Sequence, residues 1–354
     1  MSNFPLAYKL SWLPRLLKPS LAGDRHGYLP AQGDLTPLPV STRRLVFLGD
    51  ISAVANRVAP VVDDGLRALI ASADLVVGNC EAPVVDRPRH RFGTALGTLH
   101  AMTPDYLAET LRAAAIEPSR LVLSLANNHM LDQGVEGYVA TRRALADLGI
   151  ATIGCCDDGP ARPIELGGVS VALAAFTQWR NAKAEAFAGR VTMLEDIARN
   201  DLAALRDTGA DLVCVVPHWD REFRHFPSAA TRQIARELAG NGARLIVGHH
   251  AHVLQPAERI GESLVAYGIG DFLSTALPRQ PWPTRLGAIL SLEISADPGT
   301  RGKVAGWRFT PFFRLRANGH ERLVSIRSKT DGFYDKVNER FRAIFPPLAK
   351  PVQS

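Results

Sequence analysis

Residues 244–252 have the sequence Arg-Leu-Ile-Val-Gly-His-His-Ala-His, an apolar run followed by three histidines within four positions. The run predicts a short buried strand that ends at Gly248. Neutral imidazole is the commonest metal ligand, so three imidazoles at a strand end indicate a metal or catalytic site more than a structural histidine. Because His250 and His252 are two residues apart, an extended backbone would point both to one face.

Other apolar runs of the chain end in the same way, with polar side chains directly after them. Buried strands are predicted over 45–48, 74–77, 121–125 and 211–216. The polar residues that follow them are Asp50, Asn79, Glu81, Asn127, Asn128, His129 and His218. Ligands bind at the carboxyl ends of strands in α/β sheets, so these residues are candidates for one common site. Taken alone, Asp50 fits a helix or turn cap equally well.

Helical apolar spacing separates these strands and predicts an α/β fold built in layers. The helical segments are 61–71, 104–115, 135–148, 194–205 and 228–239. Further β patterns cover 285–294 and 303–315, and a terminal helix is predicted over 331–344. We therefore expect an irregular, proline-rich arm over 1–40, one domain over 41–316, and an extension over 317–354 that holds the terminal helix.

Composition restricts the class of partner. The 354 residues are 46% hydrophobic and 21% charged, with a net charge of +6. This mild basicity favours anionic substrates such as phosphate esters, although a solvated surface explains it as well. No basic run with interleaved aromatic residues indicates nucleic acid as a partner.

The N-terminus carries apolar residues interrupted by charge and proline. Lys9, Pro14 and Arg15 break up the segment from Phe4 to Leu17, so neither a signal peptide nor a membrane span is predicted. We expect a cytoplasmic protein. Peripheral membrane contact by this segment remains open. Docking of the segment on the protein's own surface is the favoured interpretation.

The candidate ligands are carboxylates, amides and imidazoles, without a thiolate cluster. This set suits Mn, Fe, Zn or Mg. A carboxylate can bridge two metal ions about 3.5–4 Å apart, and such pairs generate hydroxide and stabilise an in-line displacement at phosphorus.

In order and position, these motifs resemble the calcineurin-like metallophosphoesterase superfamily and, within it, the CapA family, named for capsule and poly-γ-glutamate biosynthesis. The resemblance covers roughly residues 43–315. Its motifs are Gly49-Asp50, Asn79-Cys80-Glu81, Ser124 to His129 with Asp132, His218-Trp219 with Glu222, Gly248 to Gln255, and Tyr267 to Phe272. It implies an α/β/β/α sandwich that holds two divalent metal ions.

The resemblance also implies roles for individual residues. Asp50 and His252 would bind the first metal, and Asn128, His218 and His250 the second. Asn79 and Glu81 stand where the superfamily has a bridging Asp, and Glu81 is favoured because it can be anionic. Ser52 occupies the place of the usual first-motif histidine.

The remaining candidates would act around the metals. His129 would be the acid or transition-state donor. Asp132 would either orient His129 or cap the following helix. His249, Glu222 and Asp271 would support the ligands or contact substrate, and a surface ion pair is the alternative for Glu222.

The resemblance therefore implies a metal-dependent hydrolase of a phosphate ester or related bond, linked to synthesis of an anionic polymer. Its partners would be an anionic small-molecule or polymer substrate and a polymer synthase. The alternative is a non-hydrolytic accessory subunit of a polymer synthesis or export complex. The same ligands would also suit hydrolysis of an amide.

Overall fold

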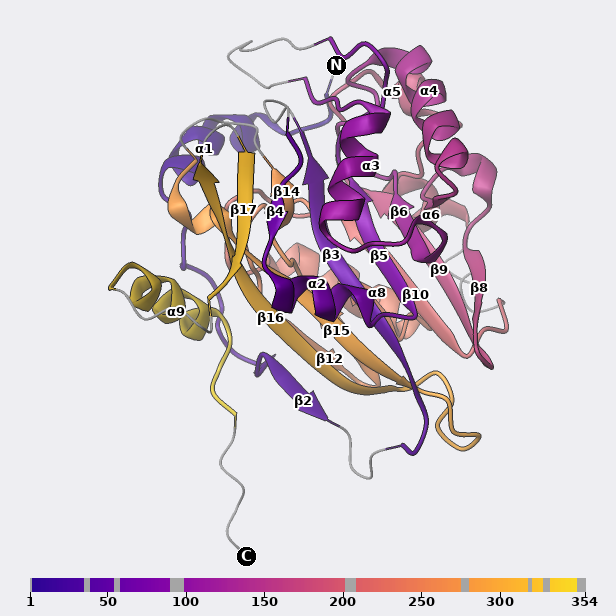
Figure 1. Ribbon diagram of the computed structural model, residues 1–354, viewed down its shortest axis with the longest axis vertical. Helices are drawn as coiled ribbons and strands as arrows, with labels where there is room; N and C mark the ends of the chain where they lie inside the picture. Colours follow the sequence, from indigo (N-terminus) through magenta and orange to yellow (C-terminus); the bar gives the residue numbers. More distant parts are fainter. Residues whose placement is uncertain are drawn as a thin grey trace, which may run out of the picture.

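The computed structural model describes residues 2–34, 39–53, 58–89, 99–200, 208–274, 280–317, 320–326 and 332–348. Within these ranges the strands form two sheets that share one apolar core. Figure 1 shows α2 and α3 in front of the larger sheet and the fainter α8 behind the sheets. This arrangement confirms the layered α/β/β/α fold class expected from the sequence.

The larger sheet has the order β4-β17-β16-β15-β3-β5-β6-β7, with β14 beside β3 and β2 beside β16. Its strands are β2 (Gln32–Asp34), β3 (Thr42–Ser52), β4 (Val61–Val62), β5 (Leu75–Cys80), β6 (Leu121–Ser124), β7 (Ala151–Ile153), β14 (Asp271–Ser274), β15 (Leu286–Ser295), β16 (Val304–Ala317) and β17 (His320–Ser325). Strands β3, β5, β6 and β7 run parallel.

The smaller sheet has the order β1-β12-β13-β11-β10-β9-β8. Its strands are β1 (Tyr28–Leu29), β8 (Arg162–Leu166), β9 (Val169–Thr177), β10 (Leu212–His218), β11 (Leu245–Val247), β12 (Ala257–Ile260) and β13 (Ser263–Ala266). Strands β9, β10, β11 and β13 run parallel. Each sheet therefore contributes a set of carboxyl ends, and these carry the candidate residues.

Most helices lie where amphipathic spacing predicts them, and α1 near the N-terminus and the short α5 are additions. They are α1 (Leu6–Leu17), α2 (Asp64–Ala71), α3 (Pro104–Ala113), α4 (Gly134–Asp147), α5 (Ala184–Phe187), α6 (Leu194–Asn200), α8 (Ala229–Gly240) and α9 (Gly332–Ile344). The predicted continuation of α6 from 201 to 205 lies outside the described residues.

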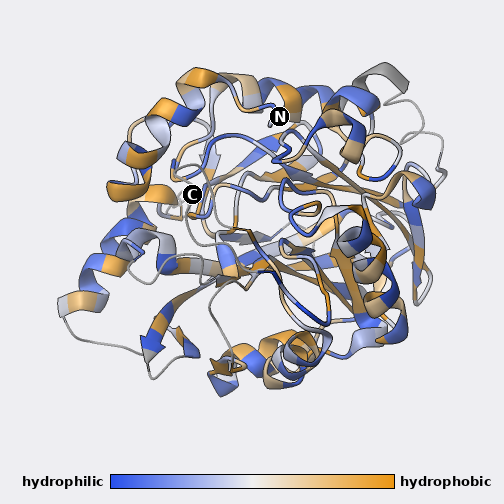
Figure 2. Ribbon diagram, turned by 90° about the horizontal axis from the view of Figure 1, so that it is seen from above, coloured by the Kyte–Doolittle hydropathy of each residue, from blue (hydrophilic) through white to orange (hydrophobic). Residues whose placement is uncertain are grey.

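Side chains along the inner strands alternate between two apolar cores, as the period of a strand requires. On β9, Val171 and Leu173 face the core between the sheets, whereas Ala174 and Phe176 belong to a second core with α8. In Figure 2 the strands are largely orange and the helices are banded orange and blue, as expected for buried sheets under amphipathic helices. Burial on both faces explains the continuous apolar runs in the sequence.

Two local predictions are corrected. Residues 1–40 are not an irregular arm, because they form α1 and two short strands. Pro14 lies inside α1, where a proline removes a helical hydrogen bond. Burial of Tyr8 and Arg15 against the rest of the protein outweighs that cost. The helix predicted from residue 61 begins at Asp64, because Val61 and Val62 pair with β17 instead.

The terminal helix predicted over 331–344 is confirmed as α9. Phe345, which directly follows α9, contacts Phe309 of β16 with ring centroids 4.7 Å apart. The predicted domain boundary at 316 falls just before the β16–β17 connection, and the larger sheet continues beyond it through β17.

Gly248, which follows β11, lies where no side chain fits. A Cβ at this position would stand 2.1 Å from Tyr267 O and 2.3 Å from Trp219 Nε1. We predict that Gly248→Ala lowers the free energy of unfolding by about 1–3 kcal/mol, as overpacking does. Urea unfolding followed by circular dichroism measures this change.

Gly65→Ala in α2 is the matched control, since nothing lies within 4 Å of a Cβ there. This change should leave stability unchanged or raise it by up to about 1 kcal/mol. Equal stability of the two variants would show that close packing around Gly248 is not required.

Candidate metal centre

The polar strand ends predicted from the sequence meet where the two sheets adjoin. Asp50 lies on β3, and Glu81 follows β5 directly. His218 ends β10 and forms a parallel bridge with His249, which follows β11. His249 Nδ1 lies 3.1 Å from Asp50 Oδ1, so the cluster joins the two sheets. Packing of the sheets therefore brings residues 199 positions apart into contact.

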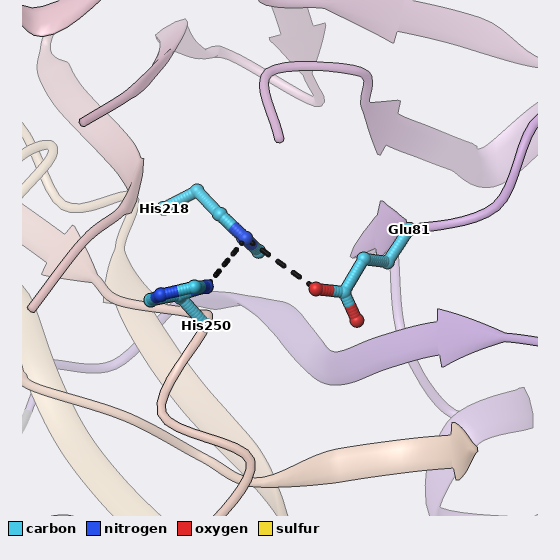
Figure 3. A group of neighbouring side chains, drawn as sticks. All are labelled: Glu81, His218 and His250. Atoms are coloured by element: carbon cyan, nitrogen blue, oxygen red, sulfur yellow. Dashed lines mark hydrogen bonds and ion pairs between the residues drawn. The ribbon is translucent and has the colours of Figure 1, made fainter. Parts of the chain in front are cut away.

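His218 lies at the centre of one group of candidate ligands. Its Nε2 is 2.8 Å from Asn128 Oδ1, 3.0 Å from His250 Nδ1 and 3.4 Å from Glu81 Oε1. Figure 3 shows His218 between His250 and the Glu81 carboxylate. An amide oxygen, two imidazole nitrogens and a carboxylate oxygen form a donor set that suits a divalent transition metal.

A second group consists of Asp50, Glu81 and His252, with one ligand atom of each within 4.8 Å of the others. His252 Nε2 is 3.7 Å from Glu81 Oε1, and His252 Nδ1 is 3.5 Å from Asp50 Oδ2. Glu81 belongs to both groups and therefore lies between them. Glu222, with His250 and His252, forms a further group of the same kind.

Glu81 tests whether these residues fit a metal ion. Its side chain is fully buried, and neither carboxylate oxygen has a hydrogen-bond partner in the described part of the chain. A carboxylate buried without a donor is costly, and a cation coordinated by the surrounding nitrogens and oxygens would offset that cost. The residues present therefore fit a divalent cation.

Burial sets the charge states of the cluster. It raises the pKa of Glu81 well above the ordinary value, and the Asp50 carboxylate adds to the increase. Burial lowers the pKa of His218 and of His250 well below the ordinary value. Both rings are thus held neutral, which is the form that binds metals.

Asp50 and His252 respond to the charges around them. Burial alone would raise the pKa of Asp50, but the hydrogen bond and charge of His249 hold it below the ordinary value. Burial alone would lower the pKa of His252, but the carboxylates of Glu81 and Asp271 raise it well above the ordinary value. The cluster therefore keeps Asp50 anionic within the core.

The backbone of the three histidines differs from the prediction. Strand β11 ends at Val247, and His250 and His252 have φ values of 89° and 52°. The expectation that they share the face of an extended strand is wrong. A bend with two residues in the left-handed region brings them together instead. Such backbone strain is typical of functional sites and persists only where packing enforces it.

Asn79 supports Asp50 and leaves the central position to Glu81. The Asn79 amide Nδ2 donates to Asp50 Oδ1 at 2.7 Å, and its Oδ1 accepts from Asn127 Nδ2 at 3.2 Å. Both ends of the Asn79 amide are therefore engaged by neighbouring side chains.

Asp132 orients His129. Its Oδ2 lies 2.6 Å from His129 Nδ1. Helix α4 has Gln133 at its N-cap with no side-chain cap hydrogen bond, so Asp132 does not cap the helix. With Nδ1 held by Asp132, His129 has only Nε2 left for another partner.

Three further residues contact the cluster that the sequence did not reveal. Asn181 Nδ2 lies 3.2 Å from His129 Nδ1, and Asn181 Oδ1 accepts from Asn128. The ring of His100 stacks on His129 at 3.6 Å, and His100 Nδ1 lies 2.7 Å from Ser52 Oγ. Tyr8 of α1 completes the set through a 2.9 Å contact between its hydroxyl and His250 Nε2. None follows an apolar run that would have marked it.

A comparison with known families identifies the chain. The profile of the family described as "Bacterial capsule synthesis protein PGA_cap" matches residues 44–276, more than half of the chain. The chain belongs to this family. The capsule synthesis family thereby confirms the resemblance to CapA that the motifs indicated.

Named relatives support the same assignment. The capsule biosynthesis protein CapA of Bacillus anthracis is 31% identical over 58% of this chain and 51% of its own length. The PGA biosynthesis protein CapA of Bacillus subtilis is 28% identical over 73% of this chain and 69% of its own length. A "Probable polyglutamine synthesis accessory protein" of Mycobacterium tuberculosis is 27% identical over 42% of this chain and 44% of its own length. The chain thus spans about half the length of two of these relatives.

The solved structures that are similar to this chain include a phosphatase of Mycoplasma pneumoniae. The similarity has a TM-score of 0.44 and 12% sequence identity, and it covers 84% of this chain and 97% of that one.

Within the described ranges, no helix combines the length and apolar character needed to cross a membrane.

Two further candidates, Glu222 and His249, are also buried beside the cluster. Glu222 is buried and lies 3.8 Å from His252 Nε2, so it is not part of a surface ion pair. His249 is buried, and its Nε2 has no hydrogen-bond partner in the described residues.

Trp219 packs in the second core and donates to Tyr267 O at 3.0 Å, as expected for a packing residue.

A buried network of Asp271, Arg314 and Glu321 holds His252 through its Nδ1 atom. Asp271 Oδ1 lies 2.7 Å from His252 Nδ1, while Asp271 Oδ2 accepts from Arg314 at 2.9 Å. Arg314 also contacts Glu321 at 3.3 Å. A carboxylate behind a histidine fixes the ring orientation and leaves the opposite nitrogen for a ligand. The Asp at position 271 therefore places its charge at the site.

We predict that Arg314→Met lowers the free energy of unfolding by roughly 3–5 kcal/mol, because Glu321 would lose its ion pair and Asp271 would keep only His252 as a cationic partner. Chemical unfolding measures the loss. The control is Arg143→Met, whose side chain is 85% exposed and lies 3.8 Å from Asp147. This change should stay within about 0.5 kcal/mol. A similar effect in both variants would contradict a role for the network.

Proposed function

We propose that this member of the capsule synthesis family is a metal-dependent hydrolase of a phosphate ester or related bond, holding two divalent ions. We further propose that it acts in the synthesis of an anionic polymer of the capsule or poly-γ-glutamate type. The names of the CapA relatives and of the family support this role in polymer synthesis.

The observation that carries the proposal is the position of Glu81. Its buried carboxylate has no hydrogen-bond partner among the residues that the structure describes, and it belongs to both candidate ligand groups. Such a position fits a bridge between two ions. Asn128, His218 and His250 would hold one ion, and Asp50 and His252 the other.

Bound metal would supply an activated water and positive charge to stabilise the oxygens at phosphorus. The carboxylate, amide and imidazole donors suit Mn, Fe, Zn or Mg as the ions. The protein's own contribution is to hold neutral imidazoles and buried carboxylates in fixed positions before the substrate arrives.

His129 is proposed as the proton donor to the leaving group. Its side chain is 10% exposed, whereas those of His218 and Asp50 are only 1% exposed. Asp132 holds His129 Nδ1, so Nε2 is the atom that can give a proton to an incoming ester oxygen. Asn181 and His100 keep the ring in place from two other sides.

Glu222 and His249 are proposed to act around the ligands. Glu222 lies within reach of His252, and His249 holds Asp50 through Nδ1. A buried carboxylate near a ligand strengthens the ligand's orientation, and an imidazole bonded to Asp50 keeps that carboxylate ionised.

The second candidate is a non-hydrolytic accessory subunit that works with a polymer synthase. One observation favours it. Ser52 occupies the place of the first-motif histidine and bonds His100 instead of a metal position. The M. tuberculosis relative is also named as an accessory protein. In this case the metal site would be structural or would hold the acidic polymer.

We predict that the purified protein contains divalent metal and hydrolyses an aryl phosphate ester. Changing His250 to Ala should lower this turnover more than about 100-fold, because even the partners of metal ligands cost 10–100-fold when removed. Elemental analysis and a p-nitrophenyl phosphate assay give the two measurements.

His26→Ala is the control, since this imidazole is 95% exposed and pairs with Asp24, which is not part of the cluster. It should retain wild-type metal content and turnover. Turnover that persists in metal-free protein would overturn the hydrolase proposal. Metal without turnover on an ester panel, together with co-purification of a synthase, would favour the accessory subunit.

A further inference from the structure

Helix α1 has two unlike faces. Leu6, Leu10, Leu13 and Leu17 are 72%, 72%, 54% and 67% exposed. At about 100° per residue these four leucines fall within an arc of about 60°. Tyr8 and Arg15 lie on the opposite side of the helix and are buried. We call the four leucines the leucine face.

The segment that carries the leucine face has only positive side-chain charges. Lys9 and Lys18 are exposed on the same segment, and residues 1–23 contain no Asp or Glu. Exposed apolar stripes of this kind mark interaction surfaces. An apolar stripe with flanking cations is the arrangement by which a helix lies in the interface of an anionic membrane.

We propose that the leucine face docks this protein on a membrane surface rich in anionic lipid. The leucines would enter the boundary between headgroups and acyl chains, and the lysines would contact lipid phosphates. Charge favours this partner over a second copy of the chain, because pairing two such faces would bring like charges together. The inner face keeps α1 attached to the protein through Arg15, which donates to Glu222 O at 2.9 Å.

The test is co-sedimentation of the full chain with phosphatidylcholine vesicles, with and without phosphatidylglycerol. Wild-type protein should bind the anionic vesicles, and added salt should weaken the binding. The triple variant L6S/L10S/L13S should bind more than about tenfold more weakly, because three leucines no longer leave water. The charge variant K9E/K18E should lose the preference for anionic lipid.

V135S/V139S in α4 is the matched control, because these valines are 38% and 59% exposed on another helix. It should bind vesicles as wild type does. Equal binding by wild type and the leucine variant would overturn the proposal, as would no binding by wild type. A wild-type dimer that the leucine changes dissociate, without vesicle binding, would assign the face to a second copy.

The inner face of α1 carries a separate observation. The Tyr8 hydroxyl oxygen lies 2.9 Å from His250 Nε2 and accepts from the Glu222 backbone N–H at 3.3 Å. The Arg15 guanidinium lies over the Tyr8 ring at 4.4 Å, and the Phe4 ring stacks on Trp179 beside it at 4.9 Å. Tyr8 is therefore held in one position against the metal centre.

We infer that Tyr8 is a positioning residue for His250, an inference that rests on the proposed metal site. The contact with Tyr8 engages Nε2, so Nδ1 is the ring nitrogen that remains for a metal ion. Nδ1 is the atom that lies 3.0 Å from His218 Nε2, inside the ligand group. Partners of this kind orient a metal-binding imidazole and raise its basicity.

Titration of metal-free protein with Co²⁺, followed by its visible absorption, tests this role. Tyr8→Phe should bind Co²⁺ about 10–100-fold more weakly with an altered spectrum. Tyr138→Phe is the control, because it removes another buried hydroxyl, which donates to Arg190 O at 3.0 Å. It should bind Co²⁺ as wild type does.

The outcomes separate this role from the proposed function. If wild type binds Co²⁺ and Tyr8→Phe binds it equally, Tyr8 is not a positioning residue. If wild type binds no Co²⁺, the metal site fails and the role of Tyr8 fails with it. Weaker binding in Tyr8→Phe but not in Tyr138→Phe supports the role, whether or not the protein hydrolyses an ester.

Discussion

The Glu81 carboxylate is buried between two sheets, and the described residues offer it no hydrogen-bond donor. A carboxylate in such a place must either take up a proton or meet a cation. Its neighbours His218, His250 and His252 present nitrogens toward it from the other sheet. The arrangement of polar groups in the cluster follows from this one constraint.

Several members of the cluster are themselves held by a second group. Asp132 holds His129, Asp271 holds His252, and Asn79 with His249 holds Asp50. These contacts fix the rings and carboxylates before any ion binds, so little reorganisation is needed on binding. His250 and His252 have positive φ values, which persist in proteins only where the surrounding structure enforces them.

Helix α1 joins this centre from the far end of the sequence. Its inner face contacts His250 through Tyr8, and its outer face exposes four leucines. One short helix therefore links a ligand of the proposed metal centre to the protein surface.

The sequence by itself determined the α/β class, the helices α3, α4 and α8 and the inner strands, because apolar period and polar strand ends are local patterns. It also named the residues that meet in the cluster, since strand ends of one sheet edge converge in any such fold. Tertiary structure alone decided that Tyr8 holds His250, that His100 reaches Ser52, and that Arg314 supports Asp271. It also decided that a bend with left-handed residues, and not an extended strand, orients His250 and His252. These contacts join segments far apart in the chain, and only the packing of two sheets and α1 around a buried charge brings them together.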